Sequence, residues 1–237
     1  MKFPTPLIRG RLVQRYKRFL ADVVLDSGET ITATCSNTGS MLGLLTPGVP
    51  VWLSVSDSPT RKYPHVWELI EADLGHGSQL VGINTSHPNK LVATAIGEGR
   101  MAPLKGYGSL RREVKYGLNS RIDILLEQAG KPDCYVEIKN VHMMRRHGHA
   151  EFPDSVTERG AKHLRELTDM VREGHRAVMV FLIQRADAEE LRLARDIDVA
   201  YGAAFDAASK AGVEALAYRC VLNPEGIEVD TAVPVRG

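Results

Sequence analysis

Two apolar runs separated by a polar turn constrain the fold of this chain more than any other feature. The runs are residues 121–126 and 134–139, and the turn between them contains Gly130 and Pro132. Strand-like runs on either side of such a turn predict a β-hairpin. Antiparallel pairing brings the start of one strand beside the end of its partner, so Asp123 is expected next to Glu137.

The ends of this hairpin place charged residues on an otherwise apolar unit. Glu137 and Lys139 share a face, because side chains alternate along a strand. Two carboxylates and an amine at one edge suit a hard divalent cation and an attacking water. The alternative is a solvated surface ion pair, since Glu-x-Lys is common on strands and residues 113–115 are a second example in this chain.

The first third of the chain consists of short β-like runs. They lie between Asp26-Ser27-Gly28, Pro47-Gly48 and similar turn signals, and no helical period is evident. We expect strands at residues 7–14, 19–25, 30–35, 51–55, 66–72 and 80–83. Five or six strands in this length predict a small barrel of the OB-fold type.

After residue 83 the pattern becomes mixed α/β. Residues 88–96 have helical spacing, Ser155-Val156-Thr157-Glu158 is a capping-box pattern, and Gly174 suits the end of the helix that follows. Residues 176–183 predict a buried central strand, and residues 199–211 an Ala-rich helix. The sequence therefore predicts an OB-like domain over residues 1–84 and a second, α/β domain over residues 85–237.

The composition is that of an ordinary globular protein. Apolar residues make up 43% of the 237 residues and charged residues 25%. The three cysteines lie far apart in apolar runs, which predicts free thiols in a reducing, cytoplasmic setting and argues against a structural zinc site. We expect no membrane partner, because the longest apolar run, residues 177–183, is too short to span a bilayer.

A net charge of +1 makes no case for nucleic acid by itself, but the distribution of charge does. Residues 3–18 hold several basic residues, no acidic one and an interleaved Tyr16, which suits phosphates and stacked bases. The alternative is a solvated strand with one aromatic residue in the core. The candidates for contact with DNA in this run are Arg15, Tyr16, Lys17 and Arg18.

Three further groups are candidates for the same role. Arg61, Lys62 and Tyr63 combine charge with an aromatic surface, and Asn37 and Thr38 form a polar turn that could bind a phosphate. Arg159 and His163 are four residues apart on the capped helix and share a face. Each group also has an alternative. Trp67, which follows the first group, alternates with Val66 and Leu69 and could belong to the core. The turn at Asn37 and Thr38 could be ordinary turn chemistry, and the helix residues a solvated face.

The pattern of acids around the hairpin resembles that of the PD-(D/E)xK nuclease superfamily. Asp123, Glu137 and Lys139 match its signature, and Glu113 is the best candidate for its upstream acid. The literal Pro132-Asp133 lies too close to Glu137 to occupy the opposite strand. The resemblance implies a catalytic set of Glu113, Asp123, Glu137 and Lys139, with Asp123 and Glu137 holding Mg²⁺ or Mn²⁺.

The chain as a whole resembles the sugar fermentation stimulation protein A (SfsA) family of bacteria and archaea. The matching segments include residues 12–23, 37–39, 61–69, 113–117, 120–123, 132–139, 152–154 and 156–167. The resemblance implies an N-terminal OB-like domain, a C-terminal PD-(D/E)xK-like domain, and DNA as the partner. Residues 142–149 depart from the usual pattern in being rich in His and Arg, and we expect a variable basic loop there, close to phosphates.

Two hypotheses follow. One is an Mg²⁺- or Mn²⁺-dependent phosphodiesterase that acts on DNA. The other is a non-catalytic DNA-binding regulator of sugar metabolism genes that retains the nuclease-like fold for grip. The complete Asp…Glu-x-Lys set favours the first, because acids beside phosphates repel DNA unless a cation neutralises them.

Overall fold

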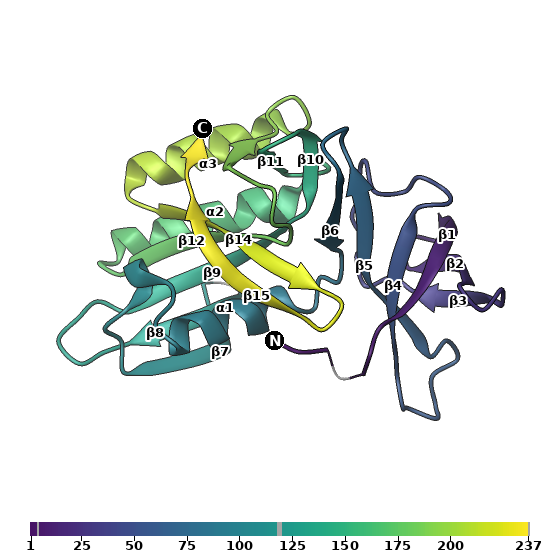
Figure 1. Cartoon of the computed structure of the whole chain (residues 1–237). Coiled ribbons are helices and arrows are strands. Elements are labelled where there is room, and N and C mark those ends of the chain that lie inside the picture. Colours follow the sequence, from purple (N-terminus) through teal and green to yellow (C-terminus); the bar gives the residue numbers. More distant parts are fainter. Residues whose placement is uncertain (4, 118–119, 237) are drawn as a thin grey trace.

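The computed structural model describes residues 1–3, 5–117 and 120–236, and its strands form three sheets (Figure 1). Two of the sheets have six strands and one has four. In the described part of the chain, no helix is both long enough and apolar enough to cross a bilayer.

The N-terminal sheet closes into a barrel. The strands lie in the order β3-β2-β1-β4-β5-β6, and each pairs antiparallel with its neighbours in that order. Strand β3 also pairs with β5 in parallel, at Thr34 and Val66. Strands β1 to β5 therefore form a closed five-stranded barrel with β6 added at its side, and the predicted OB-like fold is confirmed. The strands are β1 (Ile8–Tyr16), β2 (Leu20–Leu25), β3 (Thr30–Thr34), β4 (Pro50–Val55), β5 (His65–Asp73) and β6 (Ser78–Gly82).

The C-terminal part is a mixed α/β unit, as predicted. Its large sheet has the order β15-β14-β12-β9-β8-β7, and the small one β10-β11-β13-β16. The helices are α1 (Pro88–Gly97), α2 (Glu158–Arg172) and α3 (Val199–Ala211), with a 3₁₀ turn at Ala102–Leu104. The strands are β7 (Ser109–Tyr116), β8 (Ser120–Glu127), β9 (Cys134–Val141), β10 (Met143–Arg146), β11 (His149–Phe152), β12 (Arg176–Ile183), β13 (Glu190–Leu193), β14 (Glu214–Asn223), β15 (Gly226–Val233) and β16 (Val235–Arg236).

The large sheet has an apolar core on each face. Helices α2 and α3 cover one face, where Leu164 and Phe205 join Phe181 of β12. Helix α1 covers the other, where Leu91 joins Val180. Seven of the eight residues of β12 are buried, because this strand lies in the middle of the sheet between the two cores. The predicted central strand is thus confirmed.

Helix α2 begins later than its capping-box pattern predicts. The N-cap residue is Thr157, whose hydroxyl oxygen accepts a hydrogen bond of 3.0 Å from the Gly160 N–H, and Ser155 lies outside the helix. The Thr157 N–H donates to Asp198, the N-cap residue of α3, and this bond ties the starts of the two helices together. At the other end Gly174, with φ +90°, follows the last helical turn as predicted.

The His- and Arg-rich segment is not a loop. It forms the hairpin β10–β11 with a turn at Gly148, where φ is +80°, so this prediction is wrong. The guanidinium of Arg145 is bound by both Glu151 and Asp196, and His142 is 5% exposed. The segment is therefore held by strand pairing, and the Arg145 side chain, which the sequence suggested was available for phosphates, is engaged in ion pairs.

The two parts of the chain are joined by a polar contact between loop residues of the barrel and the segment before α2. The Asp154 carboxylate accepts hydrogen bonds from the Met41 N–H (3.0 Å) and the Ser40 hydroxyl, and lies 3.3 Å from His142 Nε2. The first three residues of the chain also contact the C-terminal part, since the Phe3 N–H donates to the carbonyl of Glu225 beside β15. They lie on the C-terminal unit, although they precede the barrel in the chain.

We expect Asp154→Asn to lower the free energy of unfolding by about 1–2 kcal/mol at neutral pH. Burial alone raises the pKa of this carboxyl, but His142, Met41 and Ser40 outweigh it and lower the pKa to about 2. The folded pKa lies below the ordinary value of 3.8, so the stabilisation is present above pH 4 and is lost between pH 4 and 2. Urea unfolding at stepped pH should show the two proteins converging as the pH falls. A gap that stays constant would contradict this account.

Candidate metal centre

Three carboxylates lie at the same level on three neighbouring strands. The register of β7 and β8 places Glu113 opposite Asp123, and that of β8 and β9 places Asp123 opposite Glu137. The β8–β9 ladder ends one residue earlier, at Ile124 and Val136. Beyond it, Asp123 Oδ2 accepts the Ile138 N–H at 2.7 Å, so the carboxylate of one strand takes the place of a backbone partner on the other.

Glu137 is the buried centre of this group. Its Oε1 contacts Nδ1 of His163 on α2 and lies 2.8 Å from Lys139 Nζ. Its Oε2 is also buried and has no hydrogen-bond partner among the described residues. Burial would raise the pKa of Glu137, but the hydrogen bond from His163 and the charge of Lys139 prevail and lower it. The side chain is thus an anion with one free oxygen.

The environment of Asp123 opposes ionisation. Burial, together with the negative charge of Glu137, raises its pKa to about 6, although the Ile138 N–H and Asn89 act in the opposite direction. Two carboxylates this close repel each other in a partly dry site. A bound cation would remove that repulsion, so this pair of side chains is suited to one.

Asn89, which the sequence did not single out, ties two of the acids together. Its Nδ2 lies 2.7 Å from Asp123 Oδ1 and 3.2 Å from Glu113 Oε1. Asn89 follows Pro88, the first residue of α1, so the start of that helix reaches the acids from the opposite face to α2. Nothing in the local sequence distinguishes this asparagine from a surface residue.

The hairpin β7–β8 is kinked at this level. Glu113 has φ +55°, in a region that costs a non-glycine residue about 1–3 kcal/mol, and neither Glu113 nor Asp123 belongs to the ladder. Ile124 packs in the core on the α1 side, whereas Ile122 packs in the core under α2. The strand therefore turns its faces over at Asp123, which ordinary alternation does not predict.

The donor set fits a hard cation that keeps part of its water shell. The described residues hold no cluster of three or more His, Cys, Asp or Glu side chains arranged around a metal position. Asp123 and the free oxygen of Glu137 could supply two carboxylate ligands, and Mg²⁺ sites use one or two carboxylates when water and phosphate oxygens complete the shell. Glu113 is exposed and could act only from the rim, through Asn89 or water.

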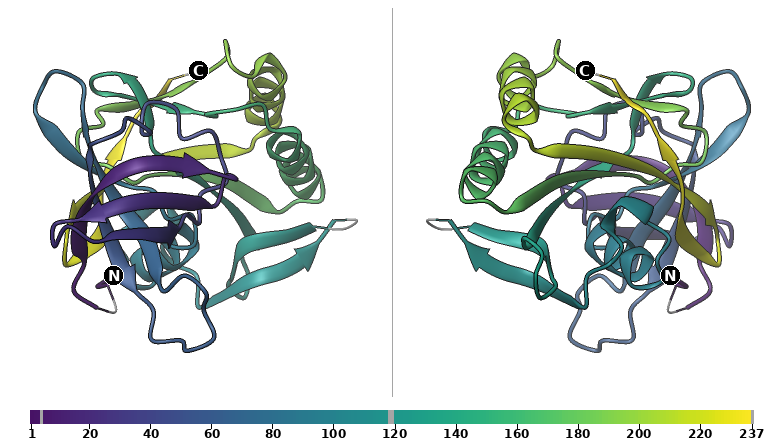
Figure 2. Two further views of the ribbon diagram at one scale, coloured as in Figure 1. Left: turned by 90° about the vertical axis from the view of Figure 1, so that its right-hand side faces the viewer. Right: turned by 90° about the vertical axis from the view of Figure 1, so that its left-hand side faces the viewer.

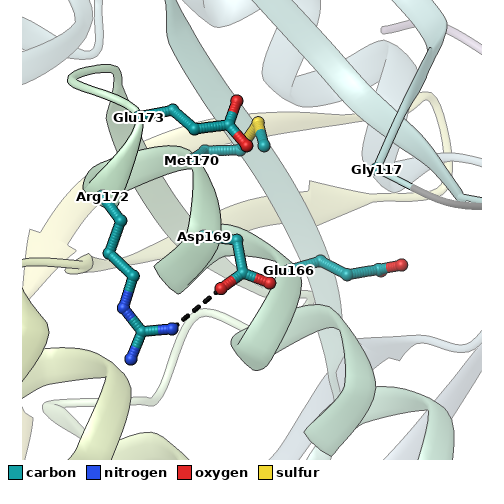
Figure 3. Close-up of a pocket in the computed structure, with 6 residues that line it drawn as sticks. All are labelled: Gly117, Glu166, Asp169, Met170, Arg172 and Glu173. Carbon is teal, nitrogen blue, oxygen red and sulfur yellow. Dashed lines mark hydrogen bonds and ion pairs between the residues drawn. The ribbon is translucent and has the colours of Figure 1, made fainter.

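A pocket of about 690 Å³ lies on the α2 side of the β7–β8 hairpin, between that helix and Gly117 (Figure 3). Three carboxylates line it: Glu166, Asp169 and Glu173. Glu166 Oε1 accepts the Ser120 hydroxyl at 2.7 Å, and Arg172 pairs with Asp169. The negative lining makes this pocket unsuited to phosphates.

Several residues predicted to contact DNA make hydrogen bonds within the protein. The guanidinium of Arg15 donates to the carbonyls of Arg18, Asn37 and Gly39, and that of Arg18 to the Thr38 carbonyl. These bonds hold the 37–39 turn against the β1–β2 turn. The Asn37 side chain is 2% exposed and contacts His142, where the barrel meets the C-terminal part. The structure does not present this amide at the surface, and its contact with DNA stays a prediction.

The remaining candidates divide between surface and interior. Lys17, Arg61 and Lys62 are exposed, and the Lys62 ammonium lies over the ring of Tyr63. Tyr16 is partly buried and its hydroxyl donates to Asp22.

On α2, Arg159 is exposed, but its Nε donates to Nε2 of His163, which is itself 5% exposed. His163 therefore holds Glu137 in place, and its contact with DNA stays a prediction. The helical spacing of Arg159 and His163 indicated that they share a face. It could not indicate the contact of His163 with Glu137 of β9, because that contact depends on tertiary packing.

Comparisons with known proteins all indicate the same protein family. The family model "Sugar fermentation stimulation protein RE domain" matches residues 86–226, and the model "SfsA N-terminal OB domain" matches residues 13–83. Sugar fermentation stimulation protein homologs of Azorhizobium caulinodans and Rhodospirillum centenum are 59% and 57% identical to the chain. The first alignment covers all of both chains and the second covers 97% of each.

A solved structure, that of Pyrococcus furiosus SfsA in complex with Ca²⁺, is similar over 100% of this chain and 98% of its own. The TM-score is 0.88 and the sequence identity 25%. The family models, the end-to-end relatives and this structure agree with the barrel and the mixed α/β part described above. The family model identifies the mixed α/β part as a restriction-endonuclease-like (RE) domain. The chain belongs to the sugar fermentation stimulation protein (SfsA) family.

Proposed function

We propose that this protein is a DNA phosphodiesterase that depends on Mg²⁺ or Mn²⁺. The observation that supports this most is the position of Asp123 beside Glu137, with a free buried oxygen on Glu137 and the Lys139 ammonium 2.8 Å from its other oxygen. Carboxylates and an amine in this arrangement suit hydrolysis of a phosphodiester. A related protein that was solved with Ca²⁺ adds support for a divalent cation.

Each side chain has a distinct part in this proposal. Asp123 and Glu137 hold the cation, which, when bound, stabilises negative charge on the phosphate. Lys139 orients the attacking water, accepts its proton in the neutral amine form and, as the resulting ammonium, donates that proton to the leaving oxygen, while His163 fixes Glu137 from α2. Asn89 fixes Asp123 and keeps Glu113 at the rim of the site.

DNA is expected to contact the barrel as well. Lys17, Arg61 and Lys62 are exposed basic residues there, and the Tyr63 ring offers a partly exposed surface for stacking. These contacts would carry no code for a base sequence, because phosphate contacts position a protein without specifying bases.

The second candidate function is DNA binding without cleavage, as in a regulator of sugar metabolism genes. The burial of the site favours it: the Glu137 side chain is 4% exposed and Lys139 13%, and the two form an ion pair. A cation and a phosphate must reach this buried pair before any reaction. A pure binder has no need of such access.

The test is incubation of the purified protein with single-stranded, double-stranded and branched DNA, with Mn²⁺, with Mg²⁺ and with EDTA. We expect cleavage of at least one DNA form with a metal and none with EDTA. If every form stays intact while salt-dependent binding is measured, the protein is a binder and the phosphodiesterase proposal is wrong.

A further inference from the structure

The outer half of the β7–β8 hairpin carries two unpaired positive charges side by side. Lys115 and Arg121 are directly opposite each other in the antiparallel register, and both are exposed. The guanidinium of Arg121 donates to the backbone carbonyl of Glu113, and within the described ranges neither side chain is within ion-pair distance of a carboxylate. Arg111, on the same strand, is bound through two hydrogen bonds to Glu127.

Such a pair is unfavourable for the free protein. Like charges directly opposite each other on a sheet destabilise it, whereas opposite charges stabilise it. The hairpin therefore holds the two cations together at a cost, and an anion between them would remove that cost.

The kink at Glu113 and Asp123 determines which side these charges face. Tyr116 and Ile122 pack into the core under α2, so their neighbours Lys115 and Arg121 face the opposite side of the hairpin. That is the side from which Asn89 of α1 reaches Asp123. Figure 2 shows the hairpin projecting from the body of the molecule, apart from α2 and α3.

Two further basic residues lie on the same side. Arg112 is opposite Ile124, whose side chain packs in the core on the α1 side, and Arg112 is exposed. Lys90 is exposed in the first turn of α1, next to Asn89. The opposite side of the hairpin has the acidic pocket with Glu166. One side of the hairpin is thus suited to phosphates and the other repels them.

We propose that Lys90, Arg112, Lys115 and Arg121 form a surface that binds the phosphates of DNA next to the candidate metal centre. This surface rests on the proposed function, because its ligand is the strand whose phosphodiester meets Asp123 and Glu137. The bound anions offset the repulsion between Lys115 and Arg121, and the kink aligns their charges with the acids rather than with the acidic pocket.

The test compares the double variant Lys115→Gln/Arg121→Gln with the parent protein and with Arg111→Gln, a matched exposed arginine of the same strand. The probe is a short fluorescent duplex in the presence of Ca²⁺, titrated at several salt concentrations, with the strands checked for integrity on a gel. We expect the double variant to bind about tenfold more weakly at low salt, with the slope of log K against log[salt] reduced by about 1.8, which is 0.9 for each lost phosphate contact. Arg111→Gln should keep the parent slope.

A second measurement needs no DNA. Removing the repulsion should leave the Tm of the double variant at low salt equal to that of the parent or above it, and a clear fall would mean that the pair has a structural role, which overturns the proposal. Equal affinity and slope in the parent and the double variant would overturn it as well, while the proposed function stands. A parent protein that binds no DNA under any condition overturns both.

Discussion

Lys139→Ala is expected to abolish metal-dependent cleavage of DNA while the fold and most of the DNA affinity remain. The Lys139 side-chain nitrogen lies 2.8 Å from Glu137 Oε1, next to the proposed ligands of the cation, and the side chain is 13% exposed. It is therefore expected to contribute little to the affinity for DNA. Assistance to proton transfer is worth about 10²–10⁴-fold in rate, so single-turnover cleavage at saturating DNA should fall by that factor.

Lys210→Ala is the control for this experiment. Lys210 is an exposed lysine in the last turn of α3, outside the candidate centre. Its replacement should leave the rate unchanged, and circular dichroism should show both variants folded. Undiminished cleavage by Lys139→Ala would mean that the activity arises elsewhere, and the catalytic assignment would be wrong.

Mn²⁺ or Mg²⁺ is expected to raise the melting temperature of the parent protein substantially. A ligand that binds only the folded state at about 100 times its Kd stabilises it by about 2.7 kcal/mol. For a chain of this size that corresponds to a shift of about 5–10 °C. The repulsion between Asp123 and Glu137, which raises the pKa of Asp123, is the physical reason for a strong response.

The matched control is the double variant Asp123→Asn/Glu137→Gln. It keeps the shape of both side chains and removes both charges, so calorimetry should show a folded protein whose melting temperature no longer responds to the cation. The same rise in the parent and the double variant would place the cation elsewhere in the molecule.

The hairpin illustrates what local sequence predicts well. Alternation and the turn at Gly130 determine the register of residues 121–139, and the structure has Asp123 beside Glu137 and Lys139 as that register requires. The central strand, residues 176–183, and the two later helices were equally readable, because period and length separate strands from helices over such runs.

The parts that sequence could not predict depend on packing between distant elements. Asn89 and His163 reach the acids from two helices on opposite faces of the sheet, and neither has a local signal for this contact. From the sequence alone, Arg15 and Asn37 resemble surface residues that are free to bind a ligand. In the structure Arg15 donates to the 37–39 turn, and Asn37 contacts His142 where the barrel meets the C-terminal part. The kink at Glu113 escaped prediction because a non-glycine residue rarely adopts positive φ.

The position of the cation itself is the most direct test of this account. Crystals of the parent protein soaked in MnCl₂ would be measured at a wavelength where manganese scatters anomalously. We predict an anomalous difference peak between the Asp123 carboxylate and the free Oε2 of Glu137, which disappears in Asp123→Asn/Glu137→Gln crystals. A peak elsewhere in the molecule, or no peak at a concentration that raises the melting temperature, would contradict the assignment of these two residues as the metal centre.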